Sequence, residues 1–435
     1  MPDAVLGVQM KQHAFKFGTQ VRDRLFSIDE AEFNTLNEQQ KQSMLPDLTG
    51  FGQTRYTPTW QDATTYRAAV FEQFNHIIPT TGMQWIAYNQ KGPDVPDAAI
   101  NLAQSGGLGV SAASVVWQRD AWPTPDEFRS ASEPDAQAFH DALIEDRLSA
   151  SGIMGRFSDS GAGPSIDSWK VLNEPLHERY FADTFVDAGI YASETEALAD
   201  YFIRAEAVRP DAELSINDFN ILNTKNDNAA IQYRDLVQDL LAAGAPIDKI
   251  GVQAHISRND ISKADIVRRL DILAETGLGI EITEFDSRDD AEQLTAAEQK
   301  QVFQDVLEAA FESEAVDGFI MWGIWDPGHW RGNAPLFDED WNIKDEASPW
   351  FELVRGEWMP MLTDLELNSQ GKWTAPEGLI SGAYDFTVTY NGNTRLYSDY
   401  DLSSDGNFLL AIPEPSAALA GFALLALACR RRRSV

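Results

Sequence analysis

The sequence is poor in cysteine and in basic residues. Its 435 residues include a single cysteine, Cys429, which excludes a disulfide within the chain and a metal site built from cysteines. Lysine and arginine together number 34 against 68 aspartates and glutamates, so the net charge is −34. A field of that sign repels nucleic acids and anionic membranes, and neither is expected as a partner of the folded part. The composition suits a protein that acts on neutral polymers, although an acidic solvated surface explains it equally well.

Residues 412–435 form a segment unlike the rest of the chain. Pro413-Glu414-Pro415 precedes a run of 13 apolar residues at 417–429, and four arginines follow at 430–433. The run is short for a membrane span, which needs about 20 residues, and the arginines favour the cytoplasmic side. This order of elements resembles the PEP-CTERM sorting tail of Gram-negative bacteria. The resemblance implies a short transmembrane tail, export to the cell envelope or the medium, and removal of the tail by a sorting protease.

The first 14 residues have a strand-like pattern and serve as a strand or linker in this interpretation. They lack the basic and apolar regions of a signal peptide. Because an exported protein needs an export signal at its front, we expect the given start to lie inside a longer gene product.

Residues 15–355 alternate between short β-branched or aromatic runs and longer amphipathic segments. The predicted strands are 15–21, 74–79, 110–117, 169–173, 213–219, 249–254, 279–284 and 318–322. Helical patterns cover 194–208, 229–243, 262–275 and 295–314, with Ser262 and Thr295 as N-caps and Gly244 and Gly277 as C-terminal stops. The alternation predicts an α/β fold, for which a (β/α)8 TIM barrel is the simplest arrangement. The pattern alone also allows a doubly wound sheet.

The pattern changes in residues 356–411. Side chains alternate in character along 384–397, on both sides of Asn391-Gly392-Asn393. An Asn-Gly pair between two such runs predicts a β-hairpin. We therefore expect a small C-terminal β appendage packed on the barrel.

Two glutamates stand where predicted strands end. Glu174 follows Asn173 at the end of 169–173, and Glu284 follows Thr283 at the end of 279–284. The carboxyl ends of barrel strands carry the active site, and two carboxylates at that place are what glycoside hydrolysis requires. Either residue by itself is equally consistent with a strand-end cap or a salt-bridge partner, so the surrounding motifs decide.

Five segments in this order resemble glycoside hydrolase family 10, the xylanase family, over nearly all of 15–355. They are Asn173-Glu174, Asn217-Asp218-Phe219-Asn220, Gly251-Val252-Gln253-Ala254-His255, Thr283-Glu284, and Trp322-Gly323-Ile324-Trp325-Asp326 with Trp330-Arg331. The resemblance implies retaining, endo-acting cleavage of β-1,4-linked xylan or a related β-glycan by double displacement. Glu174 would be the acid/base and Glu284 the nucleophile. The residues expected to bind or support the substrate are Asn173, Gln253, His255, Trp117, Gln84, Trp85, Asn217, Trp322 and Trp330. A polysaccharide substrate, a monomeric chain and no cofactor or metal complete these expectations.

The chemistry of the residues agrees with these roles. The acid must hold its proton near neutral pH, so burial and the second carboxylate should raise its pKa. His255 can hydrogen-bond Glu284 and keep it ionised, and Asn173 can donate to a sugar hydroxyl. Trp322 and Trp330 can stack against sugar rings. The alternatives are a core histidine at 255 and core tryptophans at the other two positions.

The residues that would read the sugar depart from the family pattern. Residues 79–85 are Pro-Thr-Thr-Gly-Met-Gln-Trp where the family shows Pro-Glu-Asn-x-Met-Lys-Trp. Ala113 and Gln118 replace two histidines, and Phe219 replaces a tyrosine. One interpretation is an enzyme for a modified or different β-glycan, with Thr80, Gln84 and Gln118 making replacement contacts.

Two other interpretations remain open: a weak xylanase, and a non-catalytic carbohydrate-binding barrel at the cell envelope. Joint retention of Asn173, Glu174, Gln253, His255 and Glu284 favours an active enzyme. A metal-dependent hydrolase is disfavoured, because no strand carries a His-x-His pair and no ligands cluster in the sequence.

Overall fold

The computed structural model describes residues 4–79, 81–112, 114–287, 294–367, 373 and 379–402, with only the backbone of Thr81. The chain divides into two compact units, which we describe separately. One is Phe17–Ala347, and the other combines Met1–Lys16 with Ser348–Val435. The predicted sorting tail, residues 412–435, lies outside the described residues. In the part of the chain that is described, no helix combines the length and apolar character that crossing a bilayer demands.

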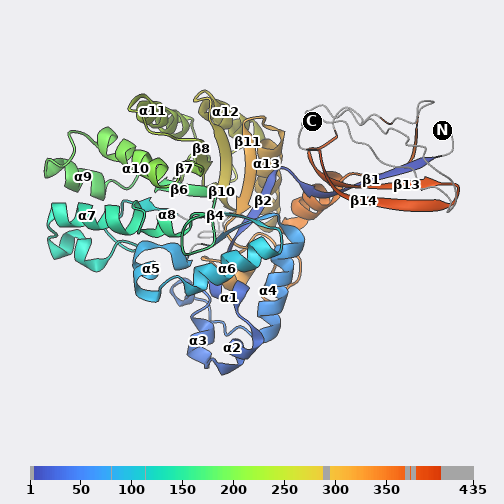
Figure 1. Cartoon of the computed structure of the whole chain (residues 1–435), viewed down its shortest axis with the longest axis horizontal. Coiled ribbons are helices and arrows are strands. Elements are labelled where there is room, and N and C mark those ends of the chain that lie inside the picture. Colours follow the sequence, from blue (N-terminus) through green and yellow to red (C-terminus); the bar gives the residue numbers. More distant parts are fainter. Residues whose placement is uncertain are drawn as a thin grey trace. The chain divides into compact units, whose positions relative to one another are not determined.

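The unit Phe17–Ala347 is built around a closed barrel of parallel strands (Figure 1). The strands are β2 (Lys16–Val21), β3 (His76–Pro79), β4 (Gly109–Ala112) with β5 (Val116–Trp117), β6 (Ser168–Asn173), β7 (Glu213–Asp218), β8 (Lys249–Val252), β10 (Gly279–Ser287) and β11 (Val316–Met321). A short strand, β9 (His255–Ile256), extends the edge of β10. Because β11 pairs with both β10 and β2, the sheet closes on itself. The predicted TIM barrel is confirmed, and the doubly wound alternative is wrong.

Helices surround this barrel. The longer ones are α4 (Trp60–Gln73), α6 (Asp94–Ser105), α7 (Ala136–Arg147), α9 (Tyr180–Asp187), α10 (Glu194–Val208), α11 (Asn228–Ala242), α12 (Lys263–Ala274) and α13 (Ala296–Glu312). The shorter ones are α1 (Asp23–Ser27), α2 (Glu30–Thr35), α3 (Glu38–Gln42), α5 (Trp85–Lys91) and α8 (Ile153–Arg156). Single 3-10 turns occur at Thr49–Phe51, Thr81–Met83, Asp126–Phe128, Ser130–Ser132, Asp326–Gly328 and Asp345–Ala347.

Local sequence signals set several of these helix ends. Ser262 and Thr295 are the N-caps of α12 and α13, and each forms a reciprocal capping box with the third helical residue. Gly244 and Gly277 follow α11 and α12 with φ of 88° and 79°, a backbone region that glycine enters without steric cost. All four positions are as predicted.

The strands are buried on both faces, because side chains fill the barrel on one side and helices pack on the other. Phe285 of β10 shows this packing: its ring centroid lies 4.9 Å from those of Phe303 in α13 and Phe319 in β11. Several strands nevertheless carry buried polar groups. Lys170, Asn217 and Glu284 are all less than one-tenth exposed. Since such groups are costly to bury without partners, their gathering in the barrel marks a site.

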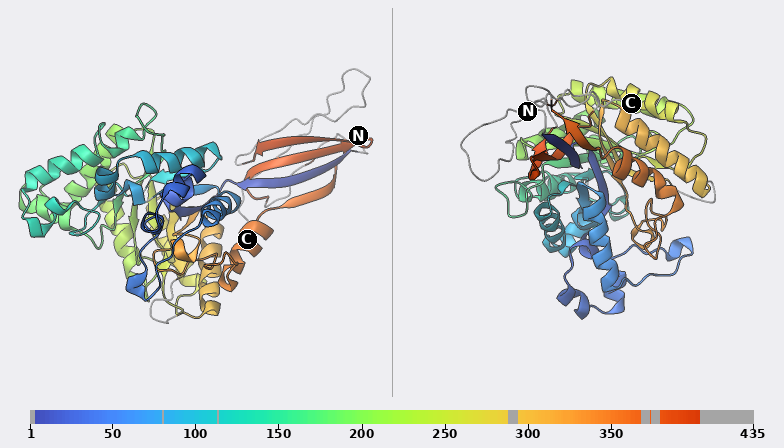
Figure 2. Two further views of the ribbon diagram at one scale, coloured as in Figure 1. Left: turned by 90° about the horizontal axis from the view of Figure 1, so that it is seen from below. Right: turned by 90° about the vertical axis from the view of Figure 1, so that its right-hand side faces the viewer.

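The second unit contains a four-stranded antiparallel sheet with the order β12-β1-β13-β14 (Figure 2). Its strands are β1 (Val5–His13), β12 (Met361–Glu366), β13 (Gly382–Tyr390) and β14 (Asn393–Asp401), and a π-helical segment covers Trp350–Glu357. Asn391 and Gly392 connect β13 to β14 with φ of 49° and 75°, as a two-residue hairpin turn of this kind requires. The predicted hairpin is confirmed. β1 pairs with both β12 and β13, so the first residues of the chain belong to the same sheet as the C-terminal strands.

Candidate active site

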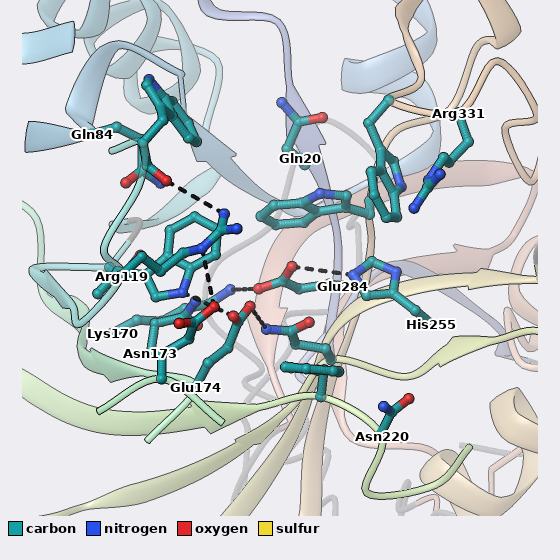
Figure 3. A pocket seen from close by; sticks show the side chains of 18 of the residues that line it. Gln20, Gln84, Arg119, Lys170, Asn173, Glu174, Asn220, His255, Glu284 and Arg331 are labelled. Atoms are coloured by element: carbon teal, nitrogen blue, oxygen red, sulfur yellow. Dashed lines mark hydrogen bonds and ion pairs between the residues drawn. The ribbon is translucent and has the colours of Figure 1, made fainter. Parts of the chain in front are cut away.

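A cavity of about 590 Å³ lies at the carboxyl ends of the barrel strands. Its lining comes from positions at or just beyond nearly every strand end. Figure 3 shows Glu174 and Glu284 close to each other in this cavity. Examples from around the barrel are Gln20, Trp117, Glu174, Phe219, His255, Glu284 and Trp322. A barrel places residues that are far apart in sequence on this one face, because all its strands point the same way.

Glu174 stands directly after β6 with φ of 57°, a left-handed conformation that costs energy for any residue except glycine. Its carboxylate accepts hydrogen bonds from Trp117 Nε1 at 2.8 Å and from Gln253 Nε2 at 2.9 Å. Burial, with a further contribution from the charge of Glu284, raises the pKa of Glu174 to about 7, although the two donors oppose the rise. As predicted, this carboxyl group can hold a proton near neutral pH.

Glu284 lies in β10 and has cationic neighbours. Its Oε1 accepts from Lys170 Nζ and from Asn217 Nδ2, each at 3.0 Å, and its Oε2 is 3.4 Å from His255 Nε2. Burial favours the neutral form, but the charges of Lys170 and His255 outweigh it and hold the pKa of Glu284 below its ordinary value. The pKa values of the two glutamates of one cavity are therefore shifted in opposite directions.

His255 connects Glu284 to a second, deeper carboxylate. Its Nδ1 lies 2.9 Å from Asp286 Oδ2, which also accepts from Trp330 Nε1 at 2.8 Å and lies 3.3 Å from His329 Nε2. Burial lowers the pKa of His255, but Asp286 and Glu284 together raise it to about 9. The imidazole is therefore protonated at neutral pH and fixed between two carboxylates. The alternative of a core histidine is wrong, since this ring lines the cavity.

Two asparagines hold this arrangement together. Asn217 is fully buried behind the cavity, where its Nδ2 donates to both Glu284 and Asn173 Oδ1, the latter at 2.8 Å. Thr283 Oγ1 donates to Asn217 Oδ1 at 2.6 Å and fixes the orientation of that amide. Because the Asn173 oxygen is occupied, its NH2 group is the part that remains to donate to a ligand. Asn217 thus supports the site without lining it.

Tryptophans form much of the cavity wall. Trp117, Trp322 and Trp330 line it as predicted, and Trp122 adds a fourth indole that sequence reasoning missed. The alternative of core tryptophans at 322 and 330 is wrong. Trp325 of the same motif, in contrast, is a core tryptophan and is fully buried.

The prediction of a substrate-binding role for Trp85 is wrong. This residue begins α5, and its ring packs 5.8 Å from Phe128 and 6.2 Å from Phe139, measured between centroids. Its Nε1 donates to Asp146 at 2.8 Å. Trp85 is a core residue beside α7 and does not line the cavity, because its ring packs against Phe128 and Phe139 and its indole N–H is bound to Asp146.

The departures from the family pattern fall into three groups. Gln84 and Phe219 line the cavity, and the Phe219 ring stacks on His177 at 3.9 Å. Gln118 is fully buried, donating to the carbonyl of Glu178 and accepting from the amide of Ala182, so its expected replacement contact with sugar is wrong. It instead fixes the loop that leads into α9. The side chains of Thr80, Thr81 and Ala113 lie outside the described residues.

Sequence reasoning also missed the charged residues around the two glutamates. Lys170, Arg119 and Arg331 line the cavity, and Asp286 supports it through His255. The sequence contained a signal for Lys170: it is a single basic residue in the apolar run Trp169–Leu172 of a predicted strand. A charge at such a position indicates a buried partner of opposite sign. In the described ranges, no three His, Cys, Asp or Glu side chains are arranged to hold a metal ion.

Comparison with known proteins gives a consistent result. The family model described as Glycosyl hydrolase family 10 matches residues 41–350. Endo-1,4-beta-xylanase B of Thermotoga neapolitana is 26% identical over 302 residues, which cover 65% of this chain and 81% of that protein. Anti-sigma-I factor RsgI6 of Acetivibrio thermocellus is 26% identical over 354 residues, but this chain spans only 42% of its length.

The solved structures show the same fold. Xylanase 10B from Thermotoga maritima superposes with a TM-score of 0.58 over 79% of this chain and 95% of that chain, at 21% identity. Xylanase 10B from Thermotoga petrophila RKU-1, solved with xylobiose, gives 0.58 over 79% of this chain and 94% of its own, at 18% identity.

Proposed function

This chain belongs to glycosyl hydrolase family 10, and from that premise we propose that it cleaves β-1,4-linked xylan or a related β-glycan internally, with retention of configuration. The observation that carries the proposal is the contrast in surroundings of two glutamates in one cavity: Glu174 accepts from two neutral donors, whereas Glu284 contacts Lys170 and His255. The pKa of Glu174 is raised to about 7, while that of Glu284 is held below its ordinary value. A glycosidase needs this combination, a proton donor beside a nucleophile that remains ionised.

We propose that the reaction is a double displacement. Glu284 attacks the anomeric carbon while Glu174 transfers its proton to the glycosidic oxygen, so the aglycone leaves as an alcohol and a glycosyl ester forms on Glu284. Ester formation removes the negative charge of Glu284, which contributes to the raised pKa of Glu174. The pKa of Glu174 therefore falls at the stage where this group must act as a base. It then takes a proton from water, which attacks the ester and releases the sugar with its original configuration.

A substrate panel with product analysis tests this function. The full chain should release reducing ends from unsubstituted β-1,4-xylan, and NMR of the fresh products should show the β-anomer before mutarotation. Initial α-anomer would disprove retention. Absence of cleavage on every β-1,4-glycan of the panel would disprove the enzymatic function.

A barrel that binds glycan without cleaving it is the second candidate. The similarity to an anti-sigma factor is the observation that favours it. It predicts measurable affinity for a β-glycan, with no release of reducing ends by the unaltered chain and no difference in binding after Glu174→Gln. The pKa difference between the two glutamates favours the catalytic proposal.

Lys170 should act as a positioning residue for Glu284. Lys170→Met removes the ammonium 3.0 Å from Glu284 Oε1. The pKa of Glu284 should rise, so the acidic limb of the kcat/KM profile should move to higher pH. We also expect kcat/KM at neutral pH to fall about tenfold, the usual effect of losing a charged hydrogen bond.

Lys263→Met is the matched control for Lys170→Met. It also removes a paired ammonium, 2.8 Å from Glu308, but on the outer helices α12 and α13. This control should keep the pH profile of the parent chain. An acidic limb that does not move in Lys170→Met would contradict the positioning role, whatever happens to kcat.

A further inference from the structure

The cavity has a cationic lining in a chain whose net charge is −34. Basic side chains that line it are Arg22, Arg119, Lys170, Arg331 and the protonated His255. The carboxylates of the lining are Glu174, Glu178 and Glu284, and the first of these is half protonated near pH 7. The lining thus has more basic than acidic side chains, which a neutral xylan chain does not require.

Most of these cations have partners. Arg119 pairs with Glu178 at 3.1 Å, Lys170 with Glu284 at 3.0 Å, and Arg22 donates to a backbone carbonyl. Arg331 differs from them. In the part of the chain that the structure describes, its guanidinium forms no ion pair, and its Nε is buried without a hydrogen-bond partner.

The Arg331 guanidinium contacts two aromatic rings. Its Cζ lies 4.2 Å from the ring centroid of Trp330 and 4.9 Å from that of Phe51. Gln53 donates to the backbone carbonyl of the same arginine at 3.4 Å. These two aromatic contacts occupy no N–H donor of the guanidinium in a conventional hydrogen bond, so its donors remain for an acceptor. The contacts with Trp330 and Phe51 restrict the Arg331 side chain at the cavity wall.

The position of Arg331 places such an acceptor within the substrate site. The Trp330 ring lies 5.3 Å from that of His255, and His255 contacts the nucleophile Glu284. Figure 3 shows Arg331 across the cavity from Arg119. A group that binds Arg331 is therefore carried by the glycan chain, close to the bond that is cleaved.

We propose that Arg331 binds the carboxylate of a uronic acid on the polysaccharide, so that the substrate is an acidic xylan. This inference rests on the proposed glycosidase function and specifies its substrate class. A carboxylate offers two coplanar oxygens that match the outward edge of a guanidinium, whereas a neutral hydroxyl satisfies one donor and leaves the charge uncompensated. Three residues of the family pattern, Glu, Asn and Lys, are replaced by Thr80, Thr81 and Gln84 in this chain. Their replacement fits a site that recognises charge as well as ring hydroxyls.

The experiment compares one polymer in two forms. Glucuronoxylan and its carboxyl-reduced derivative share backbone and branching but differ in the uronate charge. With the full chain at about 0.15 M salt, where long-range repulsion by the acidic surface is screened, kcat/KM should be at least about tenfold higher on the uronate form. In Arg331→Gln this ratio should fall to about one. Arg55→Gln removes the same charge from a surface ion pair with Asp47 and should keep the parent ratio.

Each result has a defined meaning. Equal kcat/KM of the unaltered chain on both forms overturns the inference, and so does a ratio that survives in Arg331→Gln, which would show that the arginine only supports Trp330. Cleavage of unsubstituted xylan without a uronate preference leaves the glycosidase proposal intact. If no polymer is cleaved, the glycosidase proposal fails. In that case, calorimetry measures the affinities for an aldouronic oligosaccharide and for its carboxyl-reduced form. The ratio of the two affinities, in the unaltered chain and in Arg331→Gln, then tests the carboxylate site.

Discussion

Glu284→Gln is expected to lower kcat on xylan by about 10⁴- to 10⁶-fold, the scale seen when a nucleophile that works with a partner is removed. The amide keeps the shape of the side chain, and its oxygen can still accept from Lys170 and Asn217. It cannot form the glycosyl ester on which double displacement depends. Initial rates on unsubstituted xylan, with thermal unfolding to verify the fold, measure the effect.

Glu281→Gln is the matched control for this variant. Glu281 is another buried glutamate of β10, and it does not line the cavity. Its replacement should leave kcat near the parent value even where stability falls. A 2-deoxy-2-fluoro xyloside with an activated leaving group should add its glycosyl mass to the peptide that contains Glu284. Labelling of a different carboxylate, or turnover that persists in Glu284→Gln, would contradict the assignment of the nucleophile.

Glu174→Gln should lower kcat/KM on xylan by about 10²- to 10⁴-fold, the usual contribution of a general acid. The sign of the pH dependence follows from its role. Glu174 must carry a proton to act, and its pKa is about 7, so activity of the parent chain should fall as the pH rises through that value. Glu284 must be ionised, and its pKa is lowered, so the acidic limb should lie below the ordinary glutamate range. In Glu174→Gln the basic limb should disappear.

Substrates with different leaving groups distinguish general acid catalysis by Glu174 from a structural role of this residue. An aryl xyloside whose leaving group needs no proton should still form the glycosyl enzyme in Glu174→Gln, which then accumulates because no base activates water. A burst of phenolate followed by slow turnover is the expected time course. Glu213→Gln, at the opposite end of the barrel and 2.7 Å from Lys249, is the control and should retain the basic limb. Equal loss on xylan and on the aryl xyloside, without a burst, would argue against general acid catalysis.

Features that depend on neighbouring residues could be read from the sequence. The capping boxes at Ser262 and Thr295 need only a partner three residues later, and the hairpin turn needs only Asn391-Gly392 between alternating runs. The alternation of strands and helices predicted an α/β fold, and the five motifs that resemble family 10 were needed to assign Glu174 and Glu284 as the reacting pair. These signals are local because backbone geometry constrains each over a few residues.

Features that depend on how the barrel closes were decided by the tertiary structure. Two tryptophans, Trp85 and Trp117, were both predicted to bind substrate, but only Trp117 lines the cavity. Lys170 meets Glu284 from 114 positions away, and Arg331 stacks on Phe51 from an equally unrelated segment. Sequence spacing by itself carries no information on such pairs, because their contacts and their burial arise only when separate strands converge on one face. The pKa values of the site residues depend on these contacts and on this burial.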